Sequence, residues 1–267
     1  MRKIFSDEDI KFLRDNYDKM QYKDIAQILG KTERQVRGKV NGMGLSKLRE
    51  FDKSFFNCID SPEKAYWLGL IFADGWVVFN ETQRTYELGI ELQEQDSYIL
   101  YALVSALGGN HKVSHDCHHR VFNGYEYDTN TSKLRVYSKE IVCGLISNGV
   151  VANKTCSTEY PKPLAYKRDF VRGFLDGDGC ITNSNRDNLI VTFTNANKEF
   201  LSYLRDMIFS ECGVLGTIYT ENDRKHTLRY FRVSETKKLL SWIYYEQNML
   251  LLKRKYERYK TLSGLAA

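Results

Sequence analysis

Two stretches of this chain share one pattern of apolar and small residues. Residues 67–75 read WLGLIFADG, and residues 171–179 read VRGFLDGDG. The pattern predicts a helix in both, with small residues four positions apart: Gly69 with Ala73, and Gly173 with Gly177. Such positions lie on one helix face, so each helix has a stripe without bulky side chains. Glycine within a helix costs roughly 1 kcal/mol relative to alanine, and we expect close packing of the two helices to offset this cost.

The same order of elements follows both motif helices. The first repeat, residues 61–152, begins at Ser61-Pro62; we expect strands at 76–79 and 86–93, a helix at 96–107, two strands reaching 137, and a helix that Ser138 caps. The second repeat, residues 164–267, follows a linker at 153–163; we expect strands at 180–184 and 189–196, a helix at 197–212, strands at 214–222 and 227–233, and a helix that Ser234 caps. This shared order predicts an α+β fold with two curved antiparallel sheets. Each repeat has a helix, two strands, a helix, two strands and a helix, and a pseudo-twofold axis relates the two repeats.

Residues 1–48 are predicted to form a separate module of three short helices. The first runs from Ser6 to about 17, the second covers 22–30, and the third begins at Thr32. Thr32 and Gln35 have the spacing of a capping box, and Gly30 leaves only a short turn before the third helix. The module resembles small phage and bacterial helix-turn-helix modules of Myb-like type. That resemblance implies DNA contacts from the third helix, for which we select its basic residues: Arg34, Arg37, Lys39 and Lys47. The alternative is a small helical domain with ordinary surface charge.

Residues 49–60 are predicted to be a tether between this module and the first repeat.

Composition limits the compartment and the class of protein. The chain has 267 residues, of which 42% are hydrophobic, and it has no run of about 18 apolar residues. Its six cysteines include no CxxC pair, which argues against a disulfide framework and against a cysteine-rich zinc site. We expect a soluble, cytoplasmic protein with reduced thiols and no membrane association.

The basic charge is concentrated at the two ends of the chain. The formal net charge is only +5, but residues 1–50 hold twelve Lys/Arg against eight Asp/Glu. Residues 253–260 (KRKYERYK) hold five basic residues and one acidic residue. This distribution is typical of a protein that contacts nucleic acid with particular segments.

The two motif helices both end in Asp-Gly, at Asp74 and at Asp178. If the small-residue stripes pack on each other, the two carboxylates meet at the negative ends of two helix dipoles. A divalent cation would remove this conflict, and Mg²⁺ commonly binds through one or two carboxylates together with substrate phosphates. A single Asp-Gly is more often a simple helix exit, but its duplication on small-residue helices favours a functional site.

These residues resemble the motifs of LAGLIDADG homing endonucleases of the single-chain, two-motif type. The resemblance covers residues 61–260 and implies that Asp74 and Asp178, the eighth motif positions, are catalytic and bind Mg²⁺ or another divalent cation such as Mn²⁺. We assign Ala73 and Gly177 to the same metal site. The sixth position is Asp176 in one copy and Phe72 in the other, and it takes no part in the catalytic assignment. The family makes double-strand breaks across the minor groove, so the resemblance implies a monomer that cuts double-stranded DNA.

The strand faces turned away from the motif helices are predicted to contact DNA, because a two-stranded ribbon fits the major groove. We expect contacts from strand residues Lys133, Arg135, Tyr230 and Arg232, and from loop residues Arg84, Arg120, Asn183, Asn185, Arg186, Arg224 and Lys225. For each of them the alternative is a solvated surface side chain.

Other functions stay open. The segment HKVSHDCHH (111–119) contains four histidines and a cysteine and raises the possibility of a zinc site, which the missing second cysteine pair makes the weaker interpretation. A maturase that binds intron RNA, or a transcription regulator, would use the same scaffold without cleavage. An endonuclease embedded in an intein is a further alternative, against which the N-terminal module argues.

Overall fold

The computed structural model divides the chain into two compact units, Met1–Glu50 and Phe51–Ala267. It describes residues 4–17, 19–43, 45, 51–122, 124–152, 160–184, 189–222, 225–246 and 249–264. Within these residues, no helix has the length and apolar character needed to cross a membrane.

The N-terminal unit consists of helices α1 (Asp7–Asn16), α2 (Tyr22–Leu29) and α3 (Glu33–Gly42). The predicted capping box at the start of α3 is present, since the Gln35 amide donates to the Thr32 hydroxyl and the Gln35 side chain accepts from the Thr32 amide. Gly30 ends α2 with a φ of 62°, a left-handed conformation that glycine adopts without strain. The three helices enclose a small apolar core of Leu13, Ile25, Ala26, Val36 and Val40.

The first repeat of the larger unit has the predicted order of elements. It contains α4 (Pro62–Asp74), β1 (Gly75–Asn80), β2 (Thr85–Gln93), a short 3-10 turn (Glu94–Asp96), α5 (Ser97–Ala106), β3 (Val113–Phe122), β4 (Tyr125–Tyr137) and α6 (Lys139–Ser147). The predicted caps are present, because Ser61 accepts from the Lys64 amide and Ser138 accepts from the Ile141 amide.

The second repeat follows the same order and adds a helix. It contains α7 (Lys167–Asp178), β5 (Gly179–Asn183), β6 (Leu189–Asn195), α8 (Lys198–Cys212), β7 (Thr217–Asn222), β8 (Lys225–Tyr230), α9 (Val233–Ile243) and α10 (Lys253–Ser263). The prediction of Ser234 as a cap was wrong, because α9 begins at Val233, two residues earlier than a helix capped by Ser234 would, and Arg232 is its N-cap residue.

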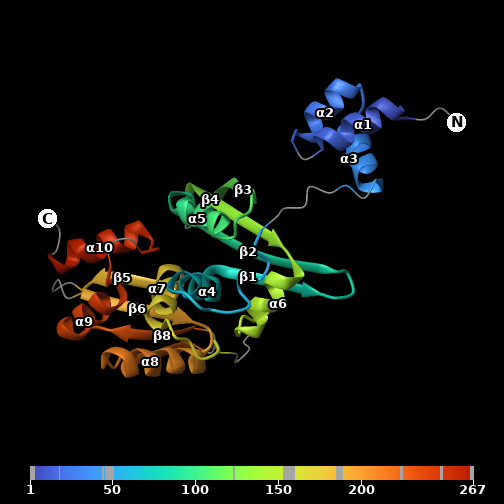
Figure 1. Ribbon diagram of the computed structural model, residues 1–267. Helices are drawn as coiled ribbons and strands as arrows, with labels where there is room; N and C mark the ends of the chain where they lie inside the picture. Colours follow the sequence, from blue (N-terminus) through green and yellow to red (C-terminus); the bar gives the residue numbers. More distant parts are fainter. Residues whose placement is uncertain are drawn as a thin grey trace. The chain divides into compact units, whose positions relative to one another are not determined.

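The two repeats build two antiparallel sheets of identical topology. The strand order is β1-β2-β4-β3 in the first sheet and β5-β6-β8-β7 in the second. Helices α4 and α7 lie side by side between the sheets, and their apolar residues join one continuous core (Figure 1). The predicted pseudo-twofold α+β fold is confirmed.

The tether is shorter than residues 49–60. Phe55 and Phe56 are buried in the core of the larger unit, and the Phe56 carbonyl accepts a 2.8 Å hydrogen bond from Asn148 Nδ2. The Asp52 amide donates to the Leu107 carbonyl. Residues 51–60 therefore belong to the larger unit, and the division falls between Glu50 and Phe51. Most of the linker at 153–163 lies outside the described residues.

Candidate active site

Helices α4 and α7 pack at backbone distance along their small-residue stripes. A Cβ atom on Gly69 would collide with the Phe170 carbonyl of α7, and one on Gly173 would collide with the Tyr66 carbonyl of α4. At the end of the pair, a Cβ atom on Gly177 would collide with the Ala73 side chain. The close packing expected from the glycines is confirmed, and it explains why larger residues are absent from both stripes.

This packing brings the two aspartates to adjacent helix ends. Asp74 is the last residue of α4 and Asp178 is the last residue of α7, and both are half-buried. A Cβ atom on Gly177 would lie 3.2 Å from Asp74 Oδ2, so the Asp74 carboxylate lies beside the residue that immediately precedes Asp178. Gly75 and Gly179 then continue directly into β1 and β5 in extended conformations. Two carboxylates therefore lie at the negative ends of two neighbouring helices.

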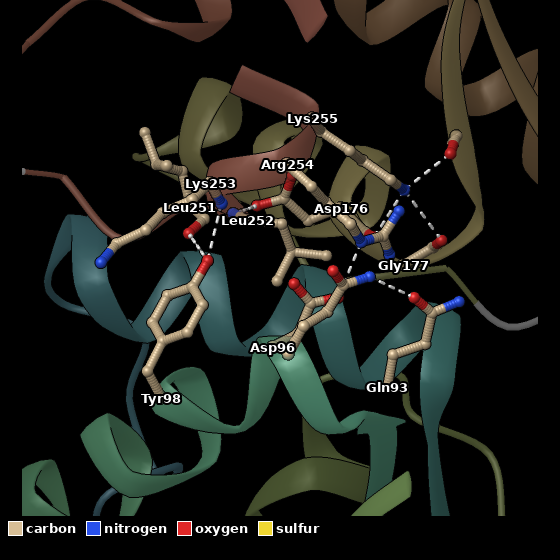
Figure 2. A network of polar contacts seen from close by, with 12 residues as sticks. Gln93, Asp96, Tyr98, Asp176, Gly177, Leu251, Leu252, Lys253, Arg254 and Lys255 are labelled. Atoms are coloured by element: carbon tan, nitrogen blue, oxygen red, sulfur yellow. Dashed lines mark hydrogen bonds and ion pairs between the residues drawn. The ribbon is translucent and has the colours of Figure 1, made fainter. Parts of the chain in front are cut away.

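Sequence reasoning missed Lys255, which is buried at this end of α7. Its ammonium donates to the carbonyl oxygens of Leu175 at 2.7 Å, Asp176 at 2.6 Å, Gly177 at 3.2 Å and Gly179 at 2.6 Å. Figure 2 shows this side chain extending from the start of α10 to the end of α7. Burial lowers the pKa of Lys255, while the Asp176 and Asp74 carboxylates act in the opposite direction. The ammonium thus offsets negative potential where the two aspartates meet.

A signal for Lys255 was present in the basic tail. Lys255 and Tyr259 are four positions apart on α10, and both are buried. The i and i+4 positions share one helix face, so this lysine lies on the apolar face of the helix rather than on its solvated face. The charge of residues 253–260 indicated contact with nucleic acid, whereas the Lys255 side chain is buried within the protein.

Beside the Asp178 end of α7 lies an open cavity of about 510 Å³ with three basic side chains. Its lining consists of Gly177, Gly179, Cys180, Ile181, Thr182, Arg254, Lys255 and Arg258. Arg254 pairs with Asp96 at 2.7 Å, and Arg258 contacts Asn183 Oδ1 at 3.4 Å. The cations and the adjacent carboxylates give this cavity the charges that a metal-bound phosphate requires.

The donor set fits a divalent cation that also binds substrate. No group of three or more His, Cys, Asp or Glu side chains in the described part of the chain could hold a metal by itself. Two carboxylates with a phosphate oxygen are a usual Mg²⁺ environment, and Asp74 and Asp178 are the two carboxylates at these helix ends. Gly177 was assigned to the metal site from sequence, and its carbonyl oxygen accepts a hydrogen bond from Lys255.

The predicted strand residues of the first sheet lie on its outer face. Lys133 and Arg135 alternate with the buried Leu134 and Val136. Lys133 pairs with Glu91 at 2.8 Å, and Arg135 pairs with Glu87 at 3.4 Å. The face turned away from the helices is therefore a ladder of paired charges.

The prediction that Tyr230 contacts DNA was wrong, and so was the placement of Arg232 on the strand; a DNA contact by Arg232 stays a prediction. Tyr230 is buried against Phe193 in the core, and Arg232 lies beyond β8, where it pairs with Glu235 at 3.0 Å. Because side chains alternate along a strand, a shift of one residue exchanges its faces. The outer face of β8 instead carries Thr227 and Arg229.

The remaining candidates are spread over the surface. Arg84, Arg120 and Lys225 are exposed at or near strand ends, and Asn183 ends β5. On α3, Arg34 and Arg37 are exposed and Lys39 is half-buried, with Arg37 paired to Glu33. The candidates outside the described residues are Lys47, Asn185, Arg186 and Arg224.

The histidine-rich segment does not gather around one point. His111 precedes β3 and packs against Phe51, while His115 and His119 lie on the opposite strand face from His118. The absence of a suitable ligand cluster among the described residues leaves the zinc interpretation without support.

Sequence and structure comparisons show which proteins this chain is similar to. The profile of the family described as LAGLIDADG-like domain matches residues 165–247. The structure of meganuclease I-SmaMI bound to uncleaveable DNA with a TTCT central four has a TM-score of 0.53 at 14% identity, covering 77% of this chain and 90% of that chain. The I-SmaMI LAGLIDADG homing endonuclease bound to cleaved DNA has a TM-score of 0.51 at 15% identity, covering 77% and 88%. No curated protein matches the chain.

These findings show which fold the larger unit shares. Residues 165–247 match the LAGLIDADG-like domain model, and the chain shares the fold of a LAGLIDADG homing endonuclease. The first repeat lies outside the profile match, but its sheet has the same strand order as the sheet of the second. The resemblance inferred from the two motifs is confirmed.

Proposed function

We propose that this protein is a site-specific DNA endonuclease that makes a divalent-metal-dependent double-strand break. The observation that carries the proposal is the position of Asp74 and Asp178 at adjacent ends of two helices in backbone contact. The DNA-bound state of I-SmaMI, which has the same fold, supports DNA as the substrate.

Asp74 and Asp178 would hold Mg²⁺ or Mn²⁺ together with the scissile phosphates. When bound, the metal supplies charge neutralisation at the phosphate and at the leaving oxygen. The chain itself contributes position and electrostatics. The Lys255 ammonium reduces the negative potential at the end of α7, and Arg254 and Arg258 attract the DNA backbone into the adjacent cavity.

The two outer sheet faces would read the target sequence. Arg135 and Glu87 on the first sheet can exchange their ion pair for guanine and cytosine edges, respectively. The second sheet presents Thr192, Thr194, Thr227 and Arg229 on its outer face. Since the two faces differ in chemistry, we expect an asymmetric target with two unlike half-sites.

The N-terminal unit would contact DNA through α3. Its exposed Arg34 and Arg37 suit a helix that meets phosphates and base edges. Covalent linkage of a second DNA-binding unit raises the effective concentration of each unit at an extended site. In full-length protein, the double substitution of Arg34 and Arg37 by Ala should weaken binding to the extended target and leave the cleavage rate of bound DNA unchanged.

Digestion of a randomised DNA library with and without Mg²⁺ tests the function. We expect discrete ends from one sequence family only when Mg²⁺ is present, and sequencing gives target and overhang together. Asp74→Asn and Asp178→Asn should each retain DNA binding and lose cleavage, while Asp206→Asn, at an exposed surface pair, serves as the matched control. DNA binding without metal-dependent cutting would favour a maturase or regulator, and wild-type cutting of both strands by Asp178→Asn would refute the proposed mechanism.

A further inference from the structure

Residues 250–253, at the start of α10, are held by polar contacts from both repeats. Arg172 Nε of α7 donates to the Leu250 carbonyl at 2.8 Å. The Tyr98 hydroxyl of α5 donates to the Leu251 carbonyl at 3.0 Å and accepts from the Lys253 amide at 2.6 Å (Figure 2). The segment that precedes Lys255 therefore has a fixed path over the motif helices.

Asp176 forms the central contact of this arrangement. Its carboxylate is fully buried, and Oδ2 accepts from the Leu252 amide at 2.8 Å and from the Tyr66 hydroxyl at 3.0 Å. Tyr66 belongs to α4 and Leu252 is the N-cap residue of α10. One side chain thus joins α7, the other motif helix and the beginning of the C-terminal helix.

The stability of the fold alone does not account for this aspartate. Burial of a carboxylate carries a desolvation penalty that its hydrogen bonds often fail to exceed, and a well-packed apolar residue is commonly as stable. The first repeat shows that alternative, because Phe72 occupies the matching motif position and packs against Phe170 and Phe200. A requirement that an apolar side chain cannot meet is therefore placed on Asp176.

We attribute this requirement to α10, whose starting position Asp176 fixes. Lys255 lies three residues after Leu252, in the first turn of α10. Its ammonium reaches four carbonyl oxygens at the end of α7 only if α10 begins where Asp176 holds it. Asp176 and Lys255 thus contact the same helix end, one through the α10 backbone and the other through its own side chain.

We propose that Asp176 is a positioning residue, which fixes the start of α10 and thereby holds Lys255 at the end of α7 beside Asp178. This inference rests on the proposed endonuclease function for its catalytic consequence. Since Phe72 occupies the matching position in the first repeat, this positioning of a lysine affects the surroundings of Asp178 and not those of Asp74. Loss of Asp176 should therefore slow the cleavage of one DNA strand more than the other.

The first test measures the position of Lys255 without requiring cleavage. Metal-free full-length protein is treated with acetic anhydride, and acetylation of Lys255 is followed by mass spectrometry. We expect strong protection in the wild type and acetylation at least about tenfold faster in Asp176→Asn, because an amide cannot reproduce the charged hydrogen-bond acceptor. Asn148→Ala removes two buried hydrogen bonds in the first repeat, to the Phe56 and Gly144 carbonyls, and controls for general destabilisation. Lys255 should stay protected in this variant.

The second test measures each strand separately. With end-labelled target DNA bound at saturation, Asp176→Asn should lower the single-turnover rate of one strand by about 100-fold, an effect typical of misplaced catalytic groups, while Kd changes less than twofold. Nicked DNA should accumulate. Tyr66→Phe, which removes only one donor to Asp176, should give a smaller effect in the same direction and serves if the Asn variant does not fold.

The outcomes separate the two proposals. Protection of Lys255 in Asp176→Asn equal to that in the wild type would overturn the positioning role, as would equal slowing of both strands in proportion to lost stability. If the wild-type protein cuts no DNA, the proposed function fails, and the acetylation result still decides whether Asp176 positions Lys255.

Discussion

Gly173 of α7 lies against the carbonyl oxygen of Tyr66 in α4, at a distance that leaves no room for a Cβ atom. Gly69 of α4 has the same relationship with Phe170, so the two helices use glycine reciprocally. This contact sets the separation of the helix ends, and through it the separation of Asp74 and Asp178.

Gly173→Ala is expected to destabilise the larger unit by about 3 kcal/mol, since the added methyl group meets backbone that cannot rotate away. Urea denaturation followed by circular dichroism measures the change. Gly38→Ala is the matched substitution in an open helix position, where nothing lies within 4 Å, and it should stabilise the N-terminal unit by about 0.5–1 kcal/mol. Equal stability of Gly173→Ala and wild type would show that the helices are farther apart than described.

The ionisation of Asp176 should make stability depend on pH. Burial raises the pKa of Asp176 from 3.8 to about 6, with Lys255 and Arg172 opposing the shift. The folded protein therefore retains a proton that the unfolded chain has lost, and the free energy of unfolding falls as pH rises from about 4 to about 6. The decline should be on the order of 3 kcal/mol, and it should be absent in Asp176→Asn.

Denaturation in EDTA at several pH values between 4 and 7 provides this measurement, because metal binding is then excluded. The difference between the wild type and Asp176→Asn isolates the contribution of this one carboxyl from other titrating groups. Parallel stability curves for the two proteins would show that Asp176 has an ordinary pKa.

Arg229 and Arg232 provide a paired test of the corrected face of β8. Arg229 is exposed on the outer face of the second sheet, while Arg232 is the N-cap residue of α9 and pairs with Glu235. Arg229→Ala should weaken target binding by about 1–3 kcal/mol if the arginine reads a base edge, and Arg232→Ala should change it much less. Fluorescence anisotropy with labelled target DNA at fixed salt measures both affinities. A larger loss of affinity in Arg232→Ala than in Arg229→Ala would contradict the assignment of Arg229 to the DNA-facing side of β8.

Tyr230→Phe should retain DNA affinity and stabilise the protein by about 1 kcal/mol. The Tyr230 hydroxyl is buried and has no hydrogen-bond partner in the described structure, and an unpaired buried hydroxyl is unfavourable. Burial raises the pKa of this tyrosine above its usual value, which is consistent with its position in the core. Thermal unfolding measures the change, and a loss of DNA affinity would indicate that Tyr230 reaches the outer face.

Local sequence signals predicted the elements that depend on neighbouring residues. Thr32, Ser61 and Ser138 cap the helices they were expected to cap, because a capping hydrogen bond spans only three residues. Predictions that depended on strand boundaries were less secure. Strand β8 ends at Tyr230 rather than continuing to 233, and Tyr230 shares the buried face of the strand with His226 and Leu228.

The sequence by itself determined the duplication, the small-residue stripes and the two Asp-Gly helix ends, because each is a pattern within one short segment. Only the tertiary structure decided that Phe56 belongs to the larger unit, that Lys255 contacts the end of α7, and that Asp176 joins α4, α7 and α10. The physical reason is that these contacts link residues far apart along the chain, and their burial and hydrogen bonds exist only once both repeats have packed around the paired helices.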